Sequence, residues 1–234
     1  MENKNRLFLI PVGLSETDMD WYLPQNVLKT IHSIQSFIVE NAKTARHFLK
    51  FIHHPDPIQT IEIYELNKHD LNGQYPEIKK LLQSNKMTGL MSEAGLPCIA
   101  DPGTHIVKLA HELDIIVKPL TGPSSIILAL IASGLNGQSF KFTGYVPSKP
   151  ADRKTALQKL ESESINVTQL FIEAPYRNDH LMGDLCLVLK PDTMLLLAID
   201  ITGENERIIC KPAAWWKLNK FVIGKVPCIF GIGR

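Results

Sequence analysis

Short apolar runs alternate with longer segments of helical period through the first half of the chain. A short apolar run predicts a buried strand, whereas apolar residues at every third or fourth position predict an amphipathic helix. On this basis we expect strands at 7–10, 37–39, 60–66, 88–91 and 115–118, separated by helices at 22–34, 42–51, 76–84 and 104–113. Because strands and helices alternate, this half predicts a mostly parallel sheet with helices on both faces.

The pattern changes after Thr121-Gly122-Pro123. A buried helix that ends at Ser133 is followed by a strand at 140–143, a helix at 153–161, a strand at 169–172 and a helix at 177–189. The remainder predicts strands at 194–199, 206–210 and 226–232, with one short Trp-bearing segment between the last two. Strands that follow one another with only turns between them pair antiparallel, which predicts a mixed sheet. We therefore expect an α/β protein of two domains, with residues 1–120 in the first and 121–234 in the second.

Composition and charge are those of a globular protein. The 234 residues are 44% hydrophobic and 21% charged, which excludes a disordered chain and a small disulfide scaffold. A net charge of +1 gives no global electrostatic case for nucleic acid or a membrane. The end of the chain is more basic: from residue 204 onward six Lys/Arg stand against two acids, a net of +4, which indicates either a solvated surface or a phosphate-facing patch.

Cysteine usage and apolar run lengths bear on the compartment. The four cysteines (Cys98, Cys186, Cys210 and Cys228) lie far apart with no Cys-x-x-Cys pair. No N-terminal stretch is typical of a secretory signal, and the longest strongly apolar run, 126–132, is far shorter than the ~20 residues that a membrane span needs. We expect a cytoplasmic protein that is not embedded in a membrane.

Turn residues collect where the predicted strands of the first half end. They are Pro11 and Gly13, then Gly95, Pro97, Asp101, Pro102 and Gly103, and finally Pro119, Gly122 and Pro123. Open α/β sheets bind ligands at this edge, where glycine lets the backbone approach a ligand and proline fixes the loop. Plain tight turns are the alternative. In the last loop Pro123 suits a first helical position, so exposed N–H groups there could hold a carboxylate or hydroxyls. The helix body that follows, 126–132, is apolar all round and is expected to be buried.

Three acidic positions have two interpretations each. Asp101 lies in the segment 92–103, which we interpret as a lid over a ligand, although it could instead be a turn acid that starts the next helix. Glu40 follows a strand and either contacts a ligand or, with Asn41, caps the helix from Ala42. Glu173 begins Glu-Ala-Pro-Tyr-Arg and either lines a site or pairs with Arg177.

Several familiar chemistries are absent from the sequence. There is no G-x-G-x-x-G after the first strand and no P-loop motif. The eight histidines show no metal-ligand spacing, and no Ser or Cys occurs in a nucleophile-elbow sequence. We expect neither a bound metal nor a covalent nucleophile.

Taken together, the segments 92–103, 119–125 with 132–135, 144–147 and 173–177 resemble the tetrapyrrole methylase superfamily of S-adenosylmethionine-dependent methyltransferases. The branch that they most resemble methylates ribose 2′-hydroxyls of small-subunit ribosomal RNA. The resemblance implies a two-domain α/β enzyme, a homodimer, that holds S-adenosylmethionine in the cleft between its domains. The positions that match the family's cofactor-lining residues are Pro11, Val12, Gly13, Ser92, Glu93, Ala94, Gly95, Pro97, Thr121, Gly122, Pro123, Ser124, Ser125, Glu173, Ala174 and Pro175.

By the same resemblance, the candidates for acting on the methyl acceptor are Glu40, Lys43, Glu93, Asp101 and Arg177. The chain departs from the branch in five places. Val12-Gly13-Leu14-Ser15 stands where the branch usually continues Pro-Ile-Gly-Asn, Asn41-Ala42-Lys43 replaces Asp-Thr-Arg, and Glu93 replaces an aspartate. Gly203 replaces a lysine, and the sequence stops at Arg234 before the branch's usual C-terminal extension. Three functions follow, and RNA methylation is the first. The alternatives are methylation of a small molecule such as a tetrapyrrole, and a diverged module that binds the cofactor without catalysis.

Overall fold

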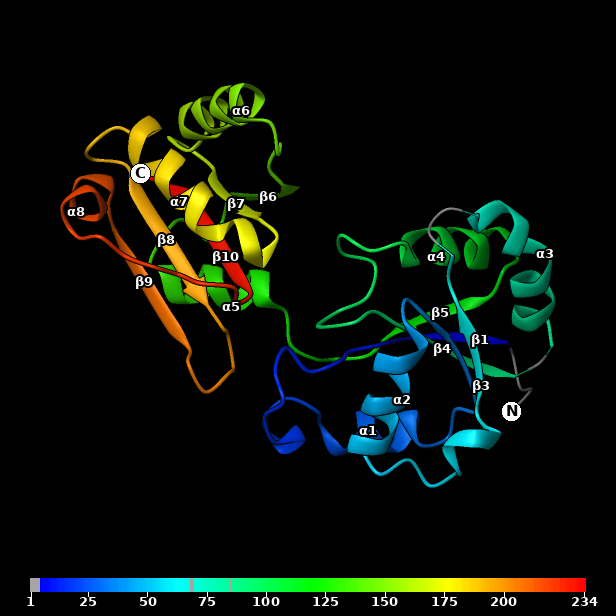
Figure 1. The fold of residues 1–234 in the computed structure, drawn as a ribbon. Helices are drawn as coiled ribbons and strands as arrows, with labels where there is room; N and C mark the ends of the chain where they lie inside the picture. The colour runs from blue at the N-terminus through cyan, green and yellow to red at the C-terminus, as the bar shows by residue number, and fades with distance from the viewer. Residues whose placement is uncertain (1–4, 68–69, 85) are drawn as a thin grey trace. The chain divides into compact units, whose positions relative to one another are not determined.

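The computed structural model describes residues 5–67, 70–84 and 86–234 (Figure 1). The chain divides into two compact units, unit 1 (Met1–Ser124) and unit 2 (Ser125–Arg234), and each is described by itself. The sequence pattern places this boundary near Leu120, whereas the division in the structure follows Ser124. Each unit is built around one five-stranded sheet with helices packed against it.

Unit 1 contains a parallel sheet, which confirms the prediction, and its strand order is β3-β2-β4-β1-β5. Its strands are β1 (Arg6–Ile10), β2 (Ser36–Val39), β3 (Glu62–Glu65), β4 (Met87–Met91) and β5 (Ile116–Pro119). The connections hold α1 (Gln25–Ile31), α2 (Ala42–Phe51), α3 (Leu71–Leu82) and α4 (Gly103–Glu112), with short 3-10 turns η1 (Met19–Trp21) and η2 (Ile58–Thr60).

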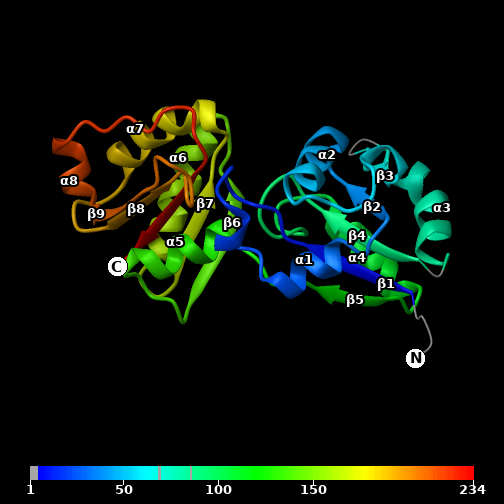
Figure 2. The same ribbon diagram turned by 90° about the horizontal axis from the view of Figure 1, so that it is seen from below.

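Alternate side chains of these strands enter two separate cores, one on each face of the sheet. Phe8, Ile10 and Phe37 pack with buried residues of α1 and α2. Leu7 and Ile38, which point the other way because successive strand residues alternate, pack with α3 and α4. The predicted coverage of both faces is therefore correct, and Figure 2 shows the unit from a second direction.

Two predicted boundaries in unit 1 are wrong by several residues. The helix expected at 76–84 begins at Leu71, because the Asp70 carboxylate accepts the N–H of Gly73 at 3.0 Å and caps the helix earlier. Pro76 therefore lies inside α3 rather than at its start, where it removes one helical hydrogen bond. The helix expected at 22–34 is restricted to Gln25–Ile31, since Pro24 precedes it and a turn at His32 ends it.

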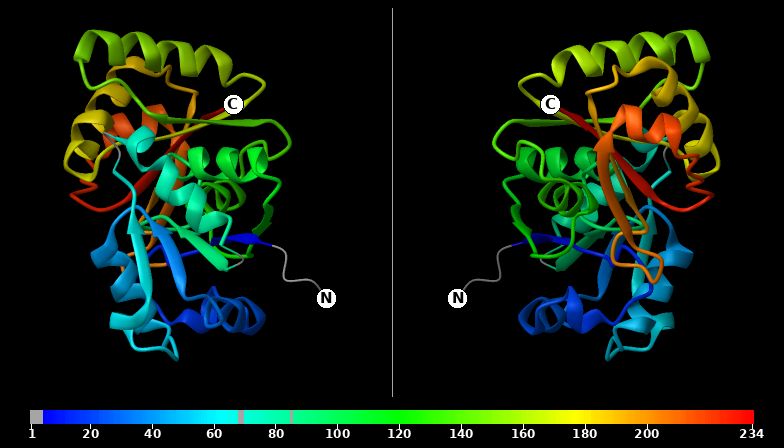
Figure 3. Two further views of the ribbon diagram at one scale, coloured as in Figure 1. Left: turned by 90° about the vertical axis from the view of Figure 1, so that its right-hand side faces the viewer. Right: turned by 90° about the vertical axis from the view of Figure 1, so that its left-hand side faces the viewer.

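Unit 2 contains a mixed sheet, as predicted, and its strand order is β6-β7-β10-β8-β9. Figure 3 shows the ribbon from two further directions. Only β6 and β7 are parallel neighbours, and the other pairs are antiparallel. The strands are β6 (Phe140–Tyr145), β7 (Thr168–Ile172), β8 (Met194–Ile199), β9 (Arg207–Pro212) and β10 (Cys228–Gly233). The helices are α5 (Ser125–Ser133), α6 (Pro150–Glu163), α7 (Asn178–Val188) and α8 (Ala213–Leu218), with a 3-10 turn η3 (Pro175–Arg177).

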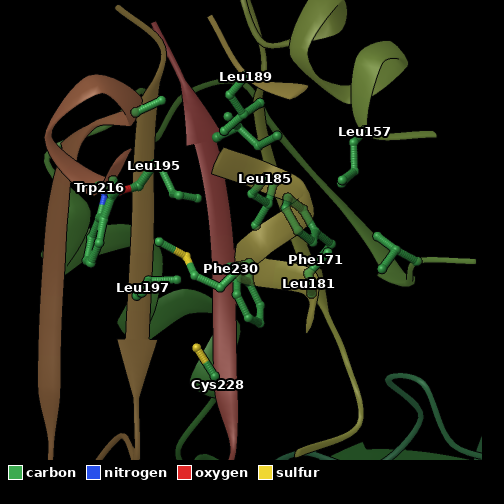
Figure 4. Close-up of a cluster of buried hydrophobic side chains, with 14 of the residues drawn as sticks. Leu157, Phe171, Leu181, Leu185, Leu189, Leu195, Leu197, Trp216, Cys228 and Phe230 are labelled. Carbon is green, nitrogen blue, oxygen red and sulfur yellow. The ribbon is translucent and has the colours of Figure 1, made fainter. Parts of the chain in front are cut away.

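One continuous core joins α6, α7 and α8 to the mixed sheet (Figure 4). The rings of Phe171 and Phe230, on neighbouring strands, stack with their centroids 5.8 Å apart. The indole N–H of Trp216 is shared between the carbonyl oxygens of Leu195 at 3.1 Å and Lys211 at 3.2 Å. These contacts fix α8 against β8 and β9, so Trp216 is a core residue.

The helix α5 differs from its prediction. Its apolar body was expected to be buried on all sides, yet Ile131 is 71% exposed and Ile127 43% exposed. Only the side that carries Ala129 and Leu130 is buried, because a helix on a sheet contacts it along one face. With nine residues α5 is short, and no helix in the described ranges is long and apolar enough to cross a membrane.

The core of unit 2 generates a paired stability prediction on α7. Leu185 is fully buried and Leu187 is 84% exposed on the same helix. Leu185→Ala leaves a cavity and is expected to lower the free energy of unfolding by about 2–5 kcal/mol. Leu187→Ala is the matched control and should change it by less than about 0.5 kcal/mol. Urea denaturation of the two variants measures both values, and equal losses would contradict the packing described for α7.

Candidate functional site

The topology of unit 1 marks one edge of its sheet as a ligand site. β1 and β4 are neighbours, yet the chain leaves β1 for α1 on one face and leaves β4 for α4 on the other. Where adjacent strands send their connections to opposite faces, a crevice opens at their carboxyl ends, and open α/β sheets bind ligands there. The turn residues singled out in the sequence belong to the loops at this edge.

The loops that follow β1 and β4 are joined by backbone hydrogen bonds. The Val12 N–H donates to the Gly95 carbonyl at 2.9 Å, and the Gly95 N–H donates to the Val12 carbonyl at 3.0 Å. Gly95 has φ +68°, a conformation that favours glycine, and a Cβ on it would lie 3.1 Å from Leu14. The bridge therefore depends on glycine at this position and couples the two loops mechanically.

The loop after β5 packs at Gly122 against the loop after β1, here called the first loop, and leaves no room for a side chain at Gly122. A Cβ at Gly122 would lie 2.1 Å from the Cβ of Pro11, a distance that no real pair of atoms adopts. The carbonyl oxygen of Pro123 is also 3.6 Å from the position of a Cβ on Gly95. The three loops thus form one contiguous surface. The helix α5 begins at Ser125 rather than at Pro123.

The segment 92–103 is a strained turn stabilised by one carboxylate. Cys98 and Ala100 have positive φ values of 72° and 61°, which cost a non-glycine residue about 1–3 kcal/mol each. Asp101 accepts the N–H of Cys98 with one oxygen and that of Gly103 with the other, both at 2.7 Å. These hydrogen bonds are those of the turn acid, the second of its two interpretations. At the start of the segment the Ser92 hydroxyl donates to the Ala94 carbonyl at 3.1 Å.

Burial shifts the pKa values of two side chains in this turn, Asp101 and Cys98. It raises the pKa of Asp101, with a smaller contribution from the charge of Glu40. It also raises the pKa of the Cys98 thiol to about 11, so Cys98 carries a neutral thiol at physiological pH and is a poor nucleophile. Both oxygens of Asp101 accept backbone N–H groups. The side chains of this loop that can contact a ligand are therefore the exposed ones, among them Glu93.

The start of α2 is capped by Asn41 and not by Glu40. The Asn41 side chain accepts the N–H groups of Lys43 at 2.9 Å and Thr44 at 3.1 Å, and the Glu65 carboxylate accepts that of Ala42 at 2.8 Å. The first N–H groups of α2 are thus satisfied within the protein and are not arranged for an anion. Lys43 is exposed, and Glu40 lies close enough to Asp101 to influence its pKa.

A cavity of about 220 Å³ lies against the first loop of unit 1. Four of its lining residues, namely Val12, Gly13, Glu93 and Ala94, are among the cofactor-site residues predicted from the sequence. The rest of the wall was not predicted from the sequence, and it consists of Leu14, Ser15, Glu16, Tyr22, Thr44, His47, Phe48 and Phe51. The spacing of Thr44, Phe48 and Phe51 on one helix face was the available signal, but the same spacing also describes an ordinary core helix.

The Glu173–Arg177 corner belongs to unit 2. Glu173 is 4% exposed, and one of its oxygens accepts the Ala174 N–H at 2.8 Å and an Nη2–H of Arg177 at 2.5 Å. Arg177 also lies over the Tyr176 ring, 5.1 Å from its centroid. The hydrogen bond to Glu173 raises the pKa of Arg177. Within the described chain, Glu173 Oε2 and Arg177 Nε are buried and make no hydrogen bond. One acceptor atom and one donor atom of the pair are therefore left without a hydrogen-bond partner.

No group of three or more His, Cys, Asp or Glu side chains in the described ranges is arranged to hold a metal ion. The candidate residues of unit 1 therefore form an edge of three joined loops with a cavity beside it, and those of unit 2 form one polar corner. Thr121 is exposed at the start of its loop, while Pro97 is buried within the second loop.

Comparison with known proteins extends these observations to both units. No family model matches the chain. Ribosomal RNA small subunit methyltransferase I of Vibrio cholerae is 33% identical over 89% of this chain and 69% of its own length. The Micromonospora olivasterospora protein of that name is 31% identical over 87% of this chain and 61% of its own length, and the Escherichia coli O157:H7 protein is 28% identical over 92% and 73%.

A solved structure supports the same fold. Uroporphyrin-III-C-methyltransferase from Thermus thermophilus superposes with a TM-score of 0.60 over 98% of this chain and 94% of its own, at 14% sequence identity. At that identity the likeness concerns the fold alone. The sequence relationship to the Vibrio cholerae protein is closer and spans most of both chains. On these grounds the chain belongs to the ribosomal RNA small subunit methyltransferase I family.

Proposed function

We propose that the protein transfers a methyl group from S-adenosylmethionine to RNA, most simply to a ribose 2′-hydroxyl. The observation that carries this proposal is the sequence relationship to proteins named as ribosomal RNA small subunit methyltransferases, which extends over about nine tenths of the chain. The aligned part spans between 61% and 73% of the length of the relatives described above. The RNA substrate named for those longer proteins is therefore a proposal for this chain.

The joined loops of unit 1 fit a methyl donor. Glycine at 122 and 95 lets the three loops pack directly against one another, which supports a ligand held by their backbone groups. We assign the donor to Pro11, Val12, Gly13, residues 92–95, Pro97 and residues 121–125. By family resemblance, Glu173, Ala174 and Pro175 of unit 2 complete the set.

The bound donor supplies an electrophilic methyl group on a sulfonium, and the residues of the protein orient the acceptor and exclude water. Such orientation contributes roughly 7–11 kcal/mol to lowering a barrier without any covalent step. A hydroxyl acceptor must also lose its proton. Of the five acceptor candidates, Glu93 lines the cavity, whereas both oxygens of Asp101 are engaged by backbone. We therefore assign the proton-accepting role to Glu93, and by the family resemblance we assign a charge-stabilising role to Arg177.

The quaternary state and location are part of the proposal. The family resemblance implies a homodimer, and the exposed apolar side chain of Ile131 on α5 is of the kind that a subunit interface covers. We place the protein in the cytoplasm, where its four free cysteines stay reduced. The proposed reaction uses no metal and no membrane.

A labelled-donor assay tests the function. We expect the purified protein to transfer label to small-subunit ribosomal RNA that lacks the host modification, with a rate that falls as salt rises, because phosphate contacts release counterions. Label in RNA at more than one methyl per enzyme would exclude a non-catalytic binding module. No label in RNA despite bound donor would refute RNA as the acceptor, and salt-independent transfer to a small molecule would favour the tetrapyrrole alternative.

Gly122→Ala tests the donor loops. The added Cβ would overlap the Pro11 ring and push the loops apart. We expect calorimetric titration to show at least about tenfold weaker binding of S-adenosylmethionine, equivalent to about 1.4 kcal/mol. Gly183→Ala, at a helix position with no heavy atom within 4 Å of the new Cβ, is the matched control and should bind normally. Normal donor binding by Gly122→Ala would remove this loop from the site.

Arg177→Ala tests the corner in unit 2. Loss of the guanidinium is expected to lower methyl transfer at least about tenfold while donor affinity changes by less than about threefold. Arg177→Lys, which keeps the charge but not the two-pronged donor geometry, should fall between the wild type and Arg177→Ala. If thermal stability and donor binding instead decline together with activity, the residue is architectural and its pairing with the buried Glu173 explains the loss.

A further inference from the structure

The structure assigns a specific ligand to the cavity beside α2: we propose that it receives a single unstacked nucleobase of the RNA acceptor. The inference rests on the proposed function, since it names the part of that substrate which the protein recognises. The cavity is formed by unit 1 alone, from the first loop, Tyr22, one face of α2 and residues 93–94.

The size of the cavity selects a small planar ligand. Its volume is about 220 Å³, below the roughly 300–1,000 Å³ of sites for drug-sized molecules. A tetrapyrrole is much larger than this space, whereas one heteroaromatic base fits it. Sequence-specific recognition of RNA commonly uses unstacked bases that are inserted between aromatic side chains.

Aromatic side chains form its wall. Tyr22, Phe48 and Phe51 all line the cavity, and Phe48 is only 5% exposed, so the core of unit 1 holds it in place. A Cβ on Gly13 would lie 2.8 Å from the Tyr22 hydroxyl oxygen and 3.0 Å from its Cζ atom. Glycine at this position therefore makes the space that the Tyr22 ring occupies. Stacking of a base on such rings contributes about 1–3 kcal/mol.

Polar groups occupy the rim. His47 Nε2 lies 3.5 Å from Glu16 Oε1, and the two side chains are 69% and 90% exposed, so water screens their attraction and the pair can open at little cost. Thr44 and Glu93 add a hydroxyl and a carboxylate. Donors and acceptors around an aromatic wall match the hydrogen-bonding edge of a base better than they match an apolar ligand.

The surroundings also argue against a phosphate in this place. The N-terminal N–H groups of α2 are taken by Asn41 and Glu65, and the carboxylates of Glu16 and Glu93 border the cavity. Negative charge at the rim repels an anion. Gly13, Glu93 and Ala94 belong both to this wall and to the proposed donor loops, so a base held here keeps its nucleotide at those loops.

The test fills the cavity without disturbing the fold. Thr44 is half-buried and lines the cavity, whereas Arg46, two residues further along the same helix, is exposed and is not part of the wall. Thr44→Trp places an indole in the space, and Arg46→Trp is the matched control. Three quantities are measured for wild type and both variants of the full chain: S-adenosylmethionine affinity by calorimetry, methyl transfer to RNA, and binding of the four uncharged ribonucleosides by NMR line broadening.

We expect Thr44→Trp to lose ribonucleoside binding and at least about tenfold in methyl transfer, with donor affinity within about twofold of wild type. Arg46→Trp should match wild type in all three quantities. Unchanged transfer and unchanged ribonucleoside binding in Thr44→Trp would overturn the inference. If Thr44→Trp loses donor affinity and Arg46→Trp does not, the inference is also overturned, because the cavity would then hold the adenine of the donor. Ribonucleoside binding that is lost only in Thr44→Trp, in a protein that methylates no RNA, would support the base site and refute the proposed function.

Discussion

The pair of backbone hydrogen bonds between Val12 and Gly95 is the constraint on which the site of unit 1 depends. It joins the loops of two adjacent parallel strands at the point where their connections diverge to opposite faces of the sheet. Gly122, packed on the ring of Pro11, attaches the third loop to the same body. The three loops at the crevice are therefore held together as one surface and do not move independently. This reduces the loss of conformational entropy on ligand binding.

The strain in the second loop is compatible with this arrangement because a single carboxylate offsets it. The positive φ values of Cys98 and Ala100 cost about 1–3 kcal/mol each. The two N–H groups that donate to Asp101 contribute about 1.5–3 kcal/mol each, since hydrogen bonds to a charged group are stronger than neutral ones. These hydrogen bonds hold the backbone of the turn in place, and Glu93 is among the side chains exposed around it.

Two departures from the pattern of the family have structural explanations. Asn41 supplies the side-chain cap of α2, so the residues Asn41-Ala42-Lys43 begin a helix whose first N–H groups are satisfied locally. At Gly203 a Cβ would lie 2.3 Å from the carboxylate atoms of Asp200, which fold back over the turn and accept the N–H of Asn205 at 3.1 Å. A lysine cannot occupy that position unless the carboxylate moves. Both changes are accommodated by local hydrogen bonding, so neither requires a different fold.

The sequence by itself determined the succession of elements, the parallel sheet of unit 1, the mixed sheet of unit 2 and the positions of the three loops. These features follow from local periodicity and turn chemistry, which act over a few residues; α2 and β8 were predicted to the residue for this reason. Tertiary structure decided which backbone N–H groups the Asp101 and Asn41 side chains accept, because that choice depends on which N–H lies within about 3 Å of the side-chain oxygen. It also decided that α5 exposes Ile131 and that Tyr22, Thr44 and Phe48 surround a cavity. Helical periodicity shows which side chains share a face, but only the packing of a second segment against that face leaves or fills a space between them.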